Sequence, residues 1–234
     1  MHPDDDDSPF PRPSNALREP DGLLALGGNL SPTRLLIAYR QGVFPWYGED
    51  QPILWWSPDP RTVFFPDRLR IPRSLRTTLR QRPFDLRIDT AFEQVMRACA
   101  EPRKDRKGTW ISEDVIDAYT TLHHLGFAHS IEAWQGDRLV GGLYGVAMGR
   151  VFFGESMFSR VSDASKVAFM HFAAQLRVWG FGLIDGQVHN PHLARLGAVE
   201  IAREDFLARL DELADDEQRL GPWRFDDPLP DPLL

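Results

Sequence analysis

Hydrophobic residues near the start of the chain recur at helical spacing and predict a helix over residues 32–41. Its apolar face is formed by four residues: Leu35, Leu36, Ala38 and Tyr39. Ser31 followed by Pro32 is typical of a helix start, and Gly42 is typical of a helix end. The same spacing predicts further helices over residues 71–80, 90–100, 113–125 and 162–179.

Between the last two helices the pattern becomes typical of strands. Residues 128–134, 138–147 and 150–154 predict three strands, joined by turns at residues 136–137 and 148–149. A further short strand is expected over residues 182–188, after Gly180 ends the long helix. An antiparallel meander, a helix and another strand form the order of an acyl-CoA N-acyltransferase-like fold. We therefore expect an α/β (α+β) protein with a mixed, largely antiparallel sheet.

Proline and aspartate divide the chain into three parts. Residues 1–20 have few large apolar groups and are expected to form a flexible arm. Residues 57–60 read Ser-Pro-Asp-Pro, which is too rich in proline for regular structure. We therefore expect a small N-terminal domain over residues 21–62 and an acyltransferase-like catalytic domain over residues 63–234.

Composition indicates an ordinary globular protein of the cytoplasm. Hydrophobic residues make up 42% of the 234 residues and charged residues 26%. No apolar stretch approaches the roughly 20 residues of a membrane span, and residues 4–7 are acidic where a signal peptide would be basic. Cys99 is the only cysteine, which excludes an internal disulfide, and we expect it to be a buried apolar side chain.

Charge is distributed unevenly along a chain whose net charge is −7. Residues 68–107 contain twelve Lys or Arg and five acids, whereas residues 204–234 contain ten acids and three arginines. This asymmetry permits a local phosphate-binding face on an acidic protein. A solvated surface with scattered ion pairs explains the same composition equally well.

Short blocks rich in glycine, tryptophan and acidic residues are spread from about residue 18 to residue 205. They read REP (18–20), GLLALGG (22–28), GVFPW (42–46), ILWWSPDPR (53–61), GTWI (108–111), AHSIE (128–132), LVGGLYGV (139–146), FGESMFS (153–159), ASK (164–166), IDGQV (184–188) and LGA (196–198). In these blocks the chain closely resembles the bacterial leucyl/phenylalanyl-tRNA–protein transferases.

The resemblance implies a reaction in which an amine cleaves an ester. The ester joins Leu or Phe, with Met as a further donor, to the terminal adenosine of its tRNA. The attacking amine is the N-terminus of a protein that begins with Arg or Lys, and the modified protein is marked for degradation. The ester is already activated, so no cofactor is expected, and we expect a monomer that binds Leu-tRNA, Phe-tRNA and acceptor proteins but no membrane.

Asp185 and Gln187 suit the proton transfer of this reaction. Residues i and i+2 of a strand point to the same face, so both side chains could reach one reacting centre. The resemblance implies that Asp185 orients the Gln187 amide, whose oxygen accepts a hydrogen from the attacking amine. Two alternatives remain open: Asp185 is itself the base, or it is a structural residue that caps a nearby backbone N–H.

Glu155 is predicted to lie just after a strand, in a glycine-rich turn before the long helix. The resemblance implies that its carboxylate binds the α-ammonium of the aminoacyl group by a charge-assisted hydrogen bond. The alternative is a salt bridge with Arg160 or Lys166.

The resemblance also implies an apolar pocket for the Leu or Phe side chain. Its candidate residues are Leu143, Phe152, Phe169, Phe172 and Ile184. Phe169 and Phe172 are spaced to share one helix face. Ordinary core packing is the alternative for each of the five. Ile184 should point away from Asp185 on an ideal strand, unless the strand twists at Gly186.

Trp46 and Trp110 are candidates for stacking on the terminal adenosine, a role that the resemblance supports. Trp110 follows a basic run over residues 103–107, so an aromatic platform would lie beside phosphate-binding charge. Trp55 and Trp56 are expected to be structural. His189 and His192 have the spacing of a metal site, but Pro191 lies between them and the reaction requires no metal.

Two other functions compete with this interpretation. An acetyl-CoA-type N-acetyltransferase would carry a glycine-rich pyrophosphate loop before the central helix, but residues 158–166 contain no glycine. A non-catalytic tRNA-binding module would use the basic segment and the tryptophans, but it would leave Glu155, Asp185 and Gln187 unexplained.

Overall fold

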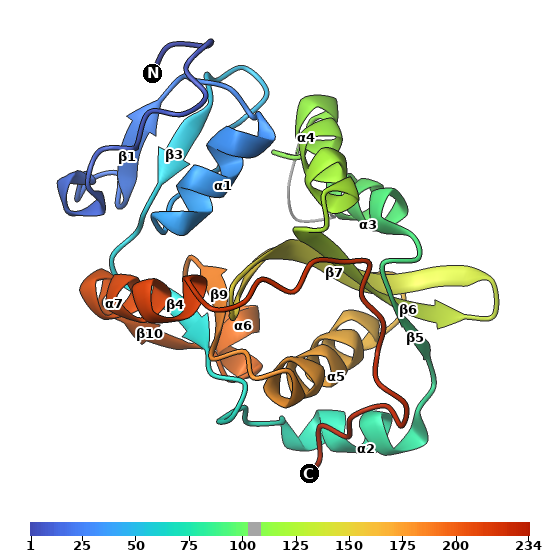
Figure 1. Ribbon diagram of the computed structural model, residues 1–234. Coiled ribbons are helices and arrows are strands. Elements are labelled where there is room, and N and C mark those ends of the chain that lie inside the picture. The colour runs from blue at the N-terminus through green and yellow to red at the C-terminus, as the bar shows by residue number, and fades with distance from the viewer. Residues whose placement is uncertain (103–108) are drawn as a thin grey trace.

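The computed structural model of the protein describes residues 1–102 and 109–234, and these residues form two β-sheets with helices around them (Figure 1). The larger sheet has seven strands in the order β10-β4-β9-β8-β7-β6-β5, and the smaller has three in the order β1-β3-β2. The basic run over residues 103–107 lies outside the described residues. None of the described helices is long and apolar enough to cross a membrane.

The small sheet and one helix make up the N-terminal part. Its elements are β1 (Leu23–Leu26), α1 (Pro32–Arg40), β2 (Phe44–Pro45) and β3 (Leu54–Trp56). As predicted, Ser31 caps α1: its hydroxyl oxygen accepts the Arg34 backbone N–H at 3.2 Å. Gly42 follows the helix with φ of +69°, a conformation that favours glycine.

Residues 1–20, which include the 3-10 turn η1 (Pro13–Asn15), lie against this part of the chain. The buried Phe10 ring packs edge-on against Trp55 at 4.8 Å, and the buried Arg34 side chain donates to the carbonyl of Ser8 at 2.5 Å. The division into an arm, a small domain over residues 21–62 and a larger domain over residues 63–234 stays a prediction.

The large sheet is mixed and largely antiparallel, as the sequence predicts. Its strands are β4 (Arg61–Phe64), β5 (Asp85–Ile88), β6 (Ala128–Gln135), β7 (Arg138–Met148), β8 (Val151–Ser159), β9 (Leu183–Gln187) and β10 (Val199–Ile201). The β6-β7-β8 meander is antiparallel, whereas β8 and β9 run parallel because α5 (Ala164–Val178) returns the chain between them.

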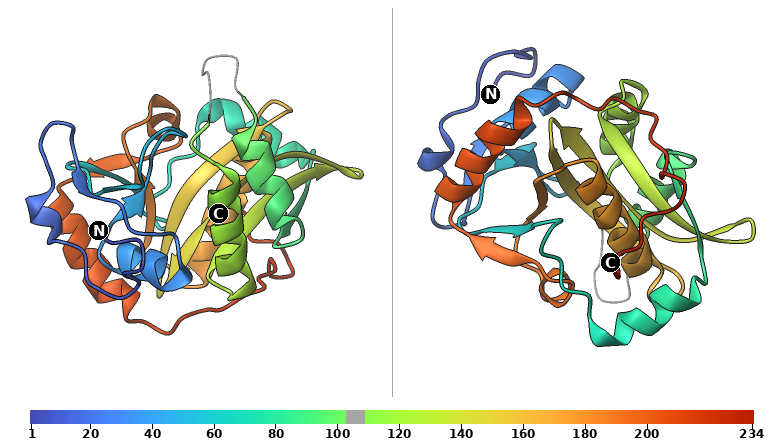
Figure 2. Two further views of the ribbon diagram at one scale, coloured as in Figure 1. Left: turned by 90° about the horizontal axis from the view of Figure 1, so that it is seen from above. Right: turned by 60° about the horizontal axis from the view of Figure 1, so that its bottom comes forward.

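Helices cover both faces of the large sheet (Figures 1 and 2), and each face has its own apolar core. On one face, α1 packs with α3 (Phe92–Ala100) and α4 (Glu113–His124) in a cluster that includes Cys99. On the other face, α5 packs with α2 (Arg73–Gln81). The chain ends after α6 (Pro191–Arg195) and α7 (Arg203–Ala214) with residues 215–234, whose Trp223 ring stacks on His129 at 3.5 Å.

Strand β8 is longer than predicted, because a β-bulge lies where the sequence suggested a turn. Tyr144 pairs with Ser156 and Gly145 pairs with Gly154, so Glu155 has no partner on β7. A bulge inserts one unpaired residue without ending the strand. The prediction that Glu155 follows the strand was therefore wrong, and Glu155 lies within β8.

Candidate active site

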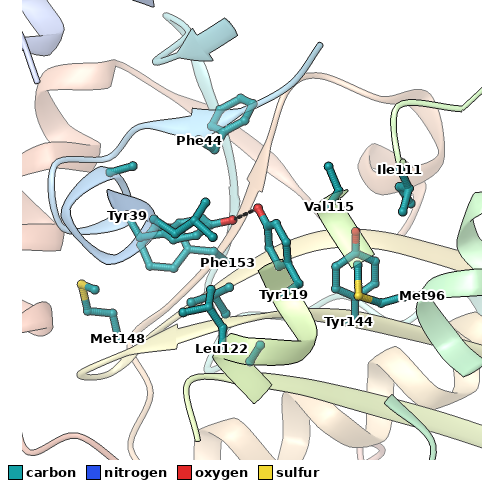
Figure 3. Close-up of a cluster of buried hydrophobic side chains, with 14 of the residues drawn as sticks. Tyr39, Phe44, Met96, Ile111, Val115, Tyr119, Leu122, Tyr144, Met148 and Phe153 are labelled. Atoms are coloured by element: carbon teal, nitrogen blue, oxygen red, sulfur yellow. Dashed lines mark hydrogen bonds between the residues drawn. The ribbon is translucent and has the colours of Figure 1, made fainter. Parts of the chain in front are cut away.

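The carboxylate of Glu155 collects hydrogen bonds from three distant parts of the chain. Its Oε1 accepts the Tyr39 hydroxyl of α1 at 2.8 Å and the Gln187 amide nitrogen of β9 at 2.8 Å. Its Oε2 lies 3.5 Å from the Tyr119 hydroxyl of α4. Figure 3 shows the Tyr39 and Tyr119 hydroxyls pointing toward each other, joined by a hydrogen bond. Glu155 is thus a polar centre between α1, α4 and the two parallel strands.

Burial raises the pKa of Glu155 from 4.5 to about 7, and the nearby carboxylate of Asp185 adds to the rise. Hydrogen bonds from Tyr39 and Gln187 and the charge of Arg61 act in the opposite direction. A pKa near neutrality means that small changes in the surroundings decide whether this carboxyl group is charged.

Three buried tyrosines surround the carboxylate. Burial raises the pKa of Tyr39, Tyr119 and Tyr144 well above the usual value, and the negative charge of Glu155 adds to each rise. All three hydroxyls therefore keep their protons. The Tyr144 hydroxyl differs from the other two, because it is buried without a hydrogen-bond partner among the described residues.

The alternative in which Glu155 forms a salt bridge with Arg160 or Lys166 was wrong. Arg160 forms its ion pair with Glu101, and the Lys166 ammonium binds Asp163 at 2.7 Å. Both cations are bound to other acids. The hydrogen-bond partners of Glu155 are instead two hydroxyl groups and an amide group.

Asp185 is fully buried and forms a two-pronged ion pair with Arg61, with N–O distances of 2.9 and 2.6 Å. Its Oδ1 also accepts the backbone N–H of Gln187 at 2.8 Å. Asp185 therefore caps a backbone N–H, as the structural alternative predicts.

The Asp185 and Gln187 side chains both lie close to Glu155, but they bind different partners. Gln187 has φ of +63°, and the register with β4 shifts between Thr62 and Val63. The left-handed residue ends the regular alternation, and the Gln187 side chain turns to Glu155 while Asp185 faces Arg61. The two residues are linked through the Gln187 backbone.

Arg61 is a site residue that sequence reasoning missed, as it missed the hydroxyls of Tyr39 and Tyr119. It is fully buried at the start of β4, with its guanidinium 4.8 Å from the Phe44 ring centre and 4.4 Å from that of Phe206. Its partner Asp185 lies 124 residues away. The available signal was an arginine at the end of the long block over residues 53–61, close to the start of a strand.

The five candidate pocket residues all lie in the core on the α5 side of the large sheet: Leu143, Phe152, Phe169, Phe172 and Ile184. The Phe152 and Phe172 rings meet edge-on at 4.7 Å. Ile184 pairs with Phe152 and Phe64 of this core, so it does alternate with Asp185 and points to the opposite face. The five residues therefore lie in one cluster, and their role as a pocket for the Leu or Phe side chain stays a prediction.

The candidate stacking residues differ in exposure. Trp46 directly follows β2 and is 41% exposed, whereas Trp110 is partly buried three residues before α4. Between these segments, Tyr47 lies against Ser112 and Asp114, and its burial raises its pKa. Trp55 is fully buried and Trp56 is partly buried, with indole N–H groups that donate to the carbonyls of Gly27 and Trp46.

The two histidines do not converge on a metal-ligand set. His189 lies 3.5 Å from the Glu200 carboxylate of β10, and His192 lies on α6. Across residues 1–102 and 109–234, no three His, Cys, Asp or Glu side chains are arranged to hold a metal ion.

Comparison with known proteins identifies the family. Residues 63–211 match the leucyl/phenylalanyl-tRNA protein transferase family, and residues 28–59 match the N-terminal domain of the same family. The leucyl/phenylalanyl-tRNA–protein transferase of Nitrosospira multiformis is 58% identical over 94% of this chain and 95% of its own length. The transferase of the same name from Aromatoleum aromaticum is 59% identical over 92% of this chain and 90% of its own length.

A solved structure, L-PGS from Bacillus licheniformis, aligns with 71% of this chain and 53% of its own length at 12% identity, with a TM-score of only 0.40. The sequence comparisons carry the identification. They define the protein as an aminoacyltransferase. The chain belongs to the leucyl/phenylalanyl-tRNA protein transferase family.

Proposed function

We propose that this protein moves Leu, Phe or Met from aminoacyl-tRNA to the N-terminal Arg or Lys of acceptor proteins. The observation that carries the proposal is the Glu155 carboxyl group, which has a pKa of about 7 and binds the Gln187 amide and two tyrosine hydroxyls. A carboxylate in this position suits a free α-ammonium group, because a charge-assisted hydrogen bond stabilises both partners. Binding the cation favours the charged form of Glu155.

The chemistry is aminolysis of the aminoacyl ester. The acceptor amine attacks the ester carbonyl, a C–N bond forms, and the bond to the ribose oxygen breaks. The proton lost by the amine equals the proton gained by the ribose hydroxyl, so the reaction requires no net acid or base. Gln187 has its amide nitrogen on Glu155, which leaves the amide oxygen to accept a hydrogen from the amine and orient its attack.

Asp185 is less suited than Gln187 to act on the amine. Both carboxylate oxygens are committed to Arg61, and the side chain is completely buried. We propose that Asp185 contributes by holding the Gln187 backbone.

The tRNA end would be held by stacking and charge. Trp46 and Trp110 flank the Tyr47–Ser112 contact, where an adenine base could lie against an indole. Helix α2 exposes Arg73, Arg76 and Arg80, which can attract the tRNA backbone on a protein whose net charge is −7. We propose that the Leu or Phe side chain passes between β8 and β9, beyond their last pair Phe153–Asp185, toward Phe152, Phe169 and Ile184 on the α5 side of the sheet.

We propose that the reaction takes place in the cytoplasm, where its substrates occur, and that a monomer suffices, because a single chain contains all the residues proposed for it. The product would carry a bulky N-terminal residue that marks it for degradation.

A donor and acceptor panel tests the proposal. Purified protein is incubated with one donor, which is Leu-tRNA, Phe-tRNA, N-acetyl-Leu-tRNA or acetyl-CoA, and with one model protein that begins with Arg, Lys or Ala. Transfer is expected from the two free aminoacyl donors to the Arg and Lys acceptors, and not from the N-acetyl donor. Transfer from N-acetyl-Leu-tRNA as fast as from Leu-tRNA would show that Glu155 does not recognise the α-ammonium group. Transfer from acetyl-CoA would indicate the competing N-acetyltransferase.

A further inference from the structure

Arg61 contacts the two segments that carry the principal partners of Glu155. At one end its guanidinium forms the two-pronged ion pair with Asp185 at 2.9 and 2.6 Å. A planar guanidinium in this geometry fixes the orientation of the carboxylate as well as its charge. The Asp185 carboxylate then accepts the Gln187 backbone N–H at 2.8 Å.

At the other end, the Arg61 Nη1 donates to the carbonyl of Gly42 at 3.1 Å. Gly42 ends the turn after α1, three residues beyond Tyr39, and its N–H bonds back to the Tyr39 carbonyl at 3.0 Å. Arg61 is thereby connected to the end of the helix that presents the Tyr39 hydroxyl to Glu155.

The Arg61 side chain is enclosed on all sides by the protein. It is completely buried, and the rings of Phe44 and Phe206 lie 4.8 and 4.4 Å from the guanidinium carbon. Those rings stabilise the cation while excluding water. Removing either member of a buried ion pair is costly because it strands the other charge.

We propose that Arg61 is a positioning residue for the transfer reaction, and that it orders Gln187 through Asp185 and Tyr39 through Gly42. This inference rests on the proposed roles of Glu155 and Gln187. Asp185 is then the link between Arg61 and the left-handed Gln187 backbone, and its contribution to catalysis is made through that link.

The test is Arg61→Lys in the full-length protein, which keeps the positive charge but loses the two-pronged geometry. We expect kcat for transfer to fall by about 10- to 100-fold, with KM for aminoacyl-tRNA changed by less than about threefold. Arg34→Lys is the matched control: Arg34 is also fully buried and bonded to an acid, Asp5, but its partners lie in residues 1–20. We expect its kcat to stay near that of the wild type.

A double-mutant cycle separates positioning from general destabilisation. If Arg61 acts in part through Gln187, Arg61→Lys should lower kcat by a clearly smaller factor in a Gln187→Ala background than in the wild type, and the remaining fall then reflects the route through Gly42 and Tyr39. An equal fall of kcat in both backgrounds would overturn the proposal, as would full activity of Arg61→Lys. Hydrogen exchange of the Gln187 backbone N–H can be measured without turnover. This N–H should lose its protection in Arg61→Lys but not in Arg34→Lys, and retained protection in Arg61→Lys would also overturn the proposal. A wild-type protein with no transfer at all would instead refute the proposed function.

Discussion

The Gln187 side-chain amide reaches Glu155 at 2.8 Å just beyond the point where their two parallel strands stop pairing. The last backbone pair of β8 and β9 joins Phe153 and Asp185, two residues before Glu155 and Gln187 respectively. A β-bulge at Glu155 and a left-handed backbone at Gln187 redirect both side chains at this point. Two local departures from regular strand geometry therefore create the polar centre of the site.

Glu155→Gln should change how stability depends on pH. The folded-state pKa of Glu155, about 7, is above the value of 4.5 for an unperturbed carboxyl group, so the folded protein binds the extra proton between these values. The free energy of unfolding of the wild type should therefore fall, relative to Glu155→Gln, as pH rises through this window, by at most about 3 kcal/mol. Urea unfolding of both proteins between about pH 5 and about pH 8 measures the difference. A difference that does not change with pH would contradict the raised pKa.

Tyr39→Phe should make Glu155 harder to ionise. The Tyr39 hydroxyl donates to the carboxylate at 2.8 Å and lowers its pKa, so removing it should raise that pKa further. If transfer requires charged Glu155, the acid side of the pH–rate profile should move to higher pH, by roughly half a pH unit or more. Tyr144→Phe is the control, because its buried hydroxyl has no hydrogen-bond partner among the described residues. Equal profiles for Tyr39→Phe and the wild type would refute this role.

Trp46→Ala should weaken aminoacyl-tRNA binding without unfolding the protein. Trp46 is 41% exposed, and loss of base stacking costs about 1–3 kcal/mol, or roughly 5- to 150-fold in affinity. Trp55→Ala is its structural counterpart, because Trp55 is fully buried and its loss should destabilise the fold by about 3–5 kcal/mol. Filter binding with Leu-tRNA and thermal unfolding should separate the two variants. Unchanged tRNA affinity in Trp46→Ala would exclude stacking.

Gly145→Ala should disrupt the sheet beside the bulge. A Cβ at Gly145 would lie 2.1 Å from the Phe153 carbonyl oxygen and 2.7 Å from the Phe152 ring, so strand and ring must both move. We expect a loss of about 2–4 kcal/mol of stability, measured by urea unfolding. At Gly154, the residue opposite, the nearest atom to a Cβ would be 3.4 Å away, so Gly154→Ala should cost much less. Similar losses from both variants would contradict this account of the bulge.

The sequence predicts most of the longer helices and strands, because they depend on neighbouring residues, but the 12-residue helix α7 was missed. The Ser31 and Ser112 caps and the long helix α5 are where spacing and capping place them. The short strands β1 to β4 have two to four residues each, too few for a periodic pattern to emerge. Strand β8 continues past Gly154 because of the bulge in its pairing with Tyr144 and Gly145, and no local sequence pattern predicts that bulge.

The site is less predictable because its contacts join distant segments. The family resemblance identified Glu155 and Gln187 as site residues. The hydrogen bond between them depends on the left-handed backbone of Gln187 at the end of β9. Tyr39 was assigned to the apolar face of its helix, and its ring does pack there. Most buried tyrosine hydroxyls have a hydrogen-bond partner, which is the one sign that Tyr39 also belongs to a polar site. The Arg61–Asp185 pair spans 124 residues, and its only sign in the sequence was an arginine at the end of the block over residues 53–61.

The most direct test of the central claim compares the wild type with Glu155→Gln in a single transfer assay. Radiolabelled Leu-tRNA is supplied with a model protein that begins with Arg, without ATP, metal ion or CoA, and the label in RNase-resistant protein is counted. The wild type should transfer label, and Glu155→Gln should transfer it at least about 100-fold more slowly, because the neutral amide cannot pair with the α-ammonium group. Absence of transfer by the wild type, or undiminished transfer by the folded Glu155→Gln protein, would contradict the account.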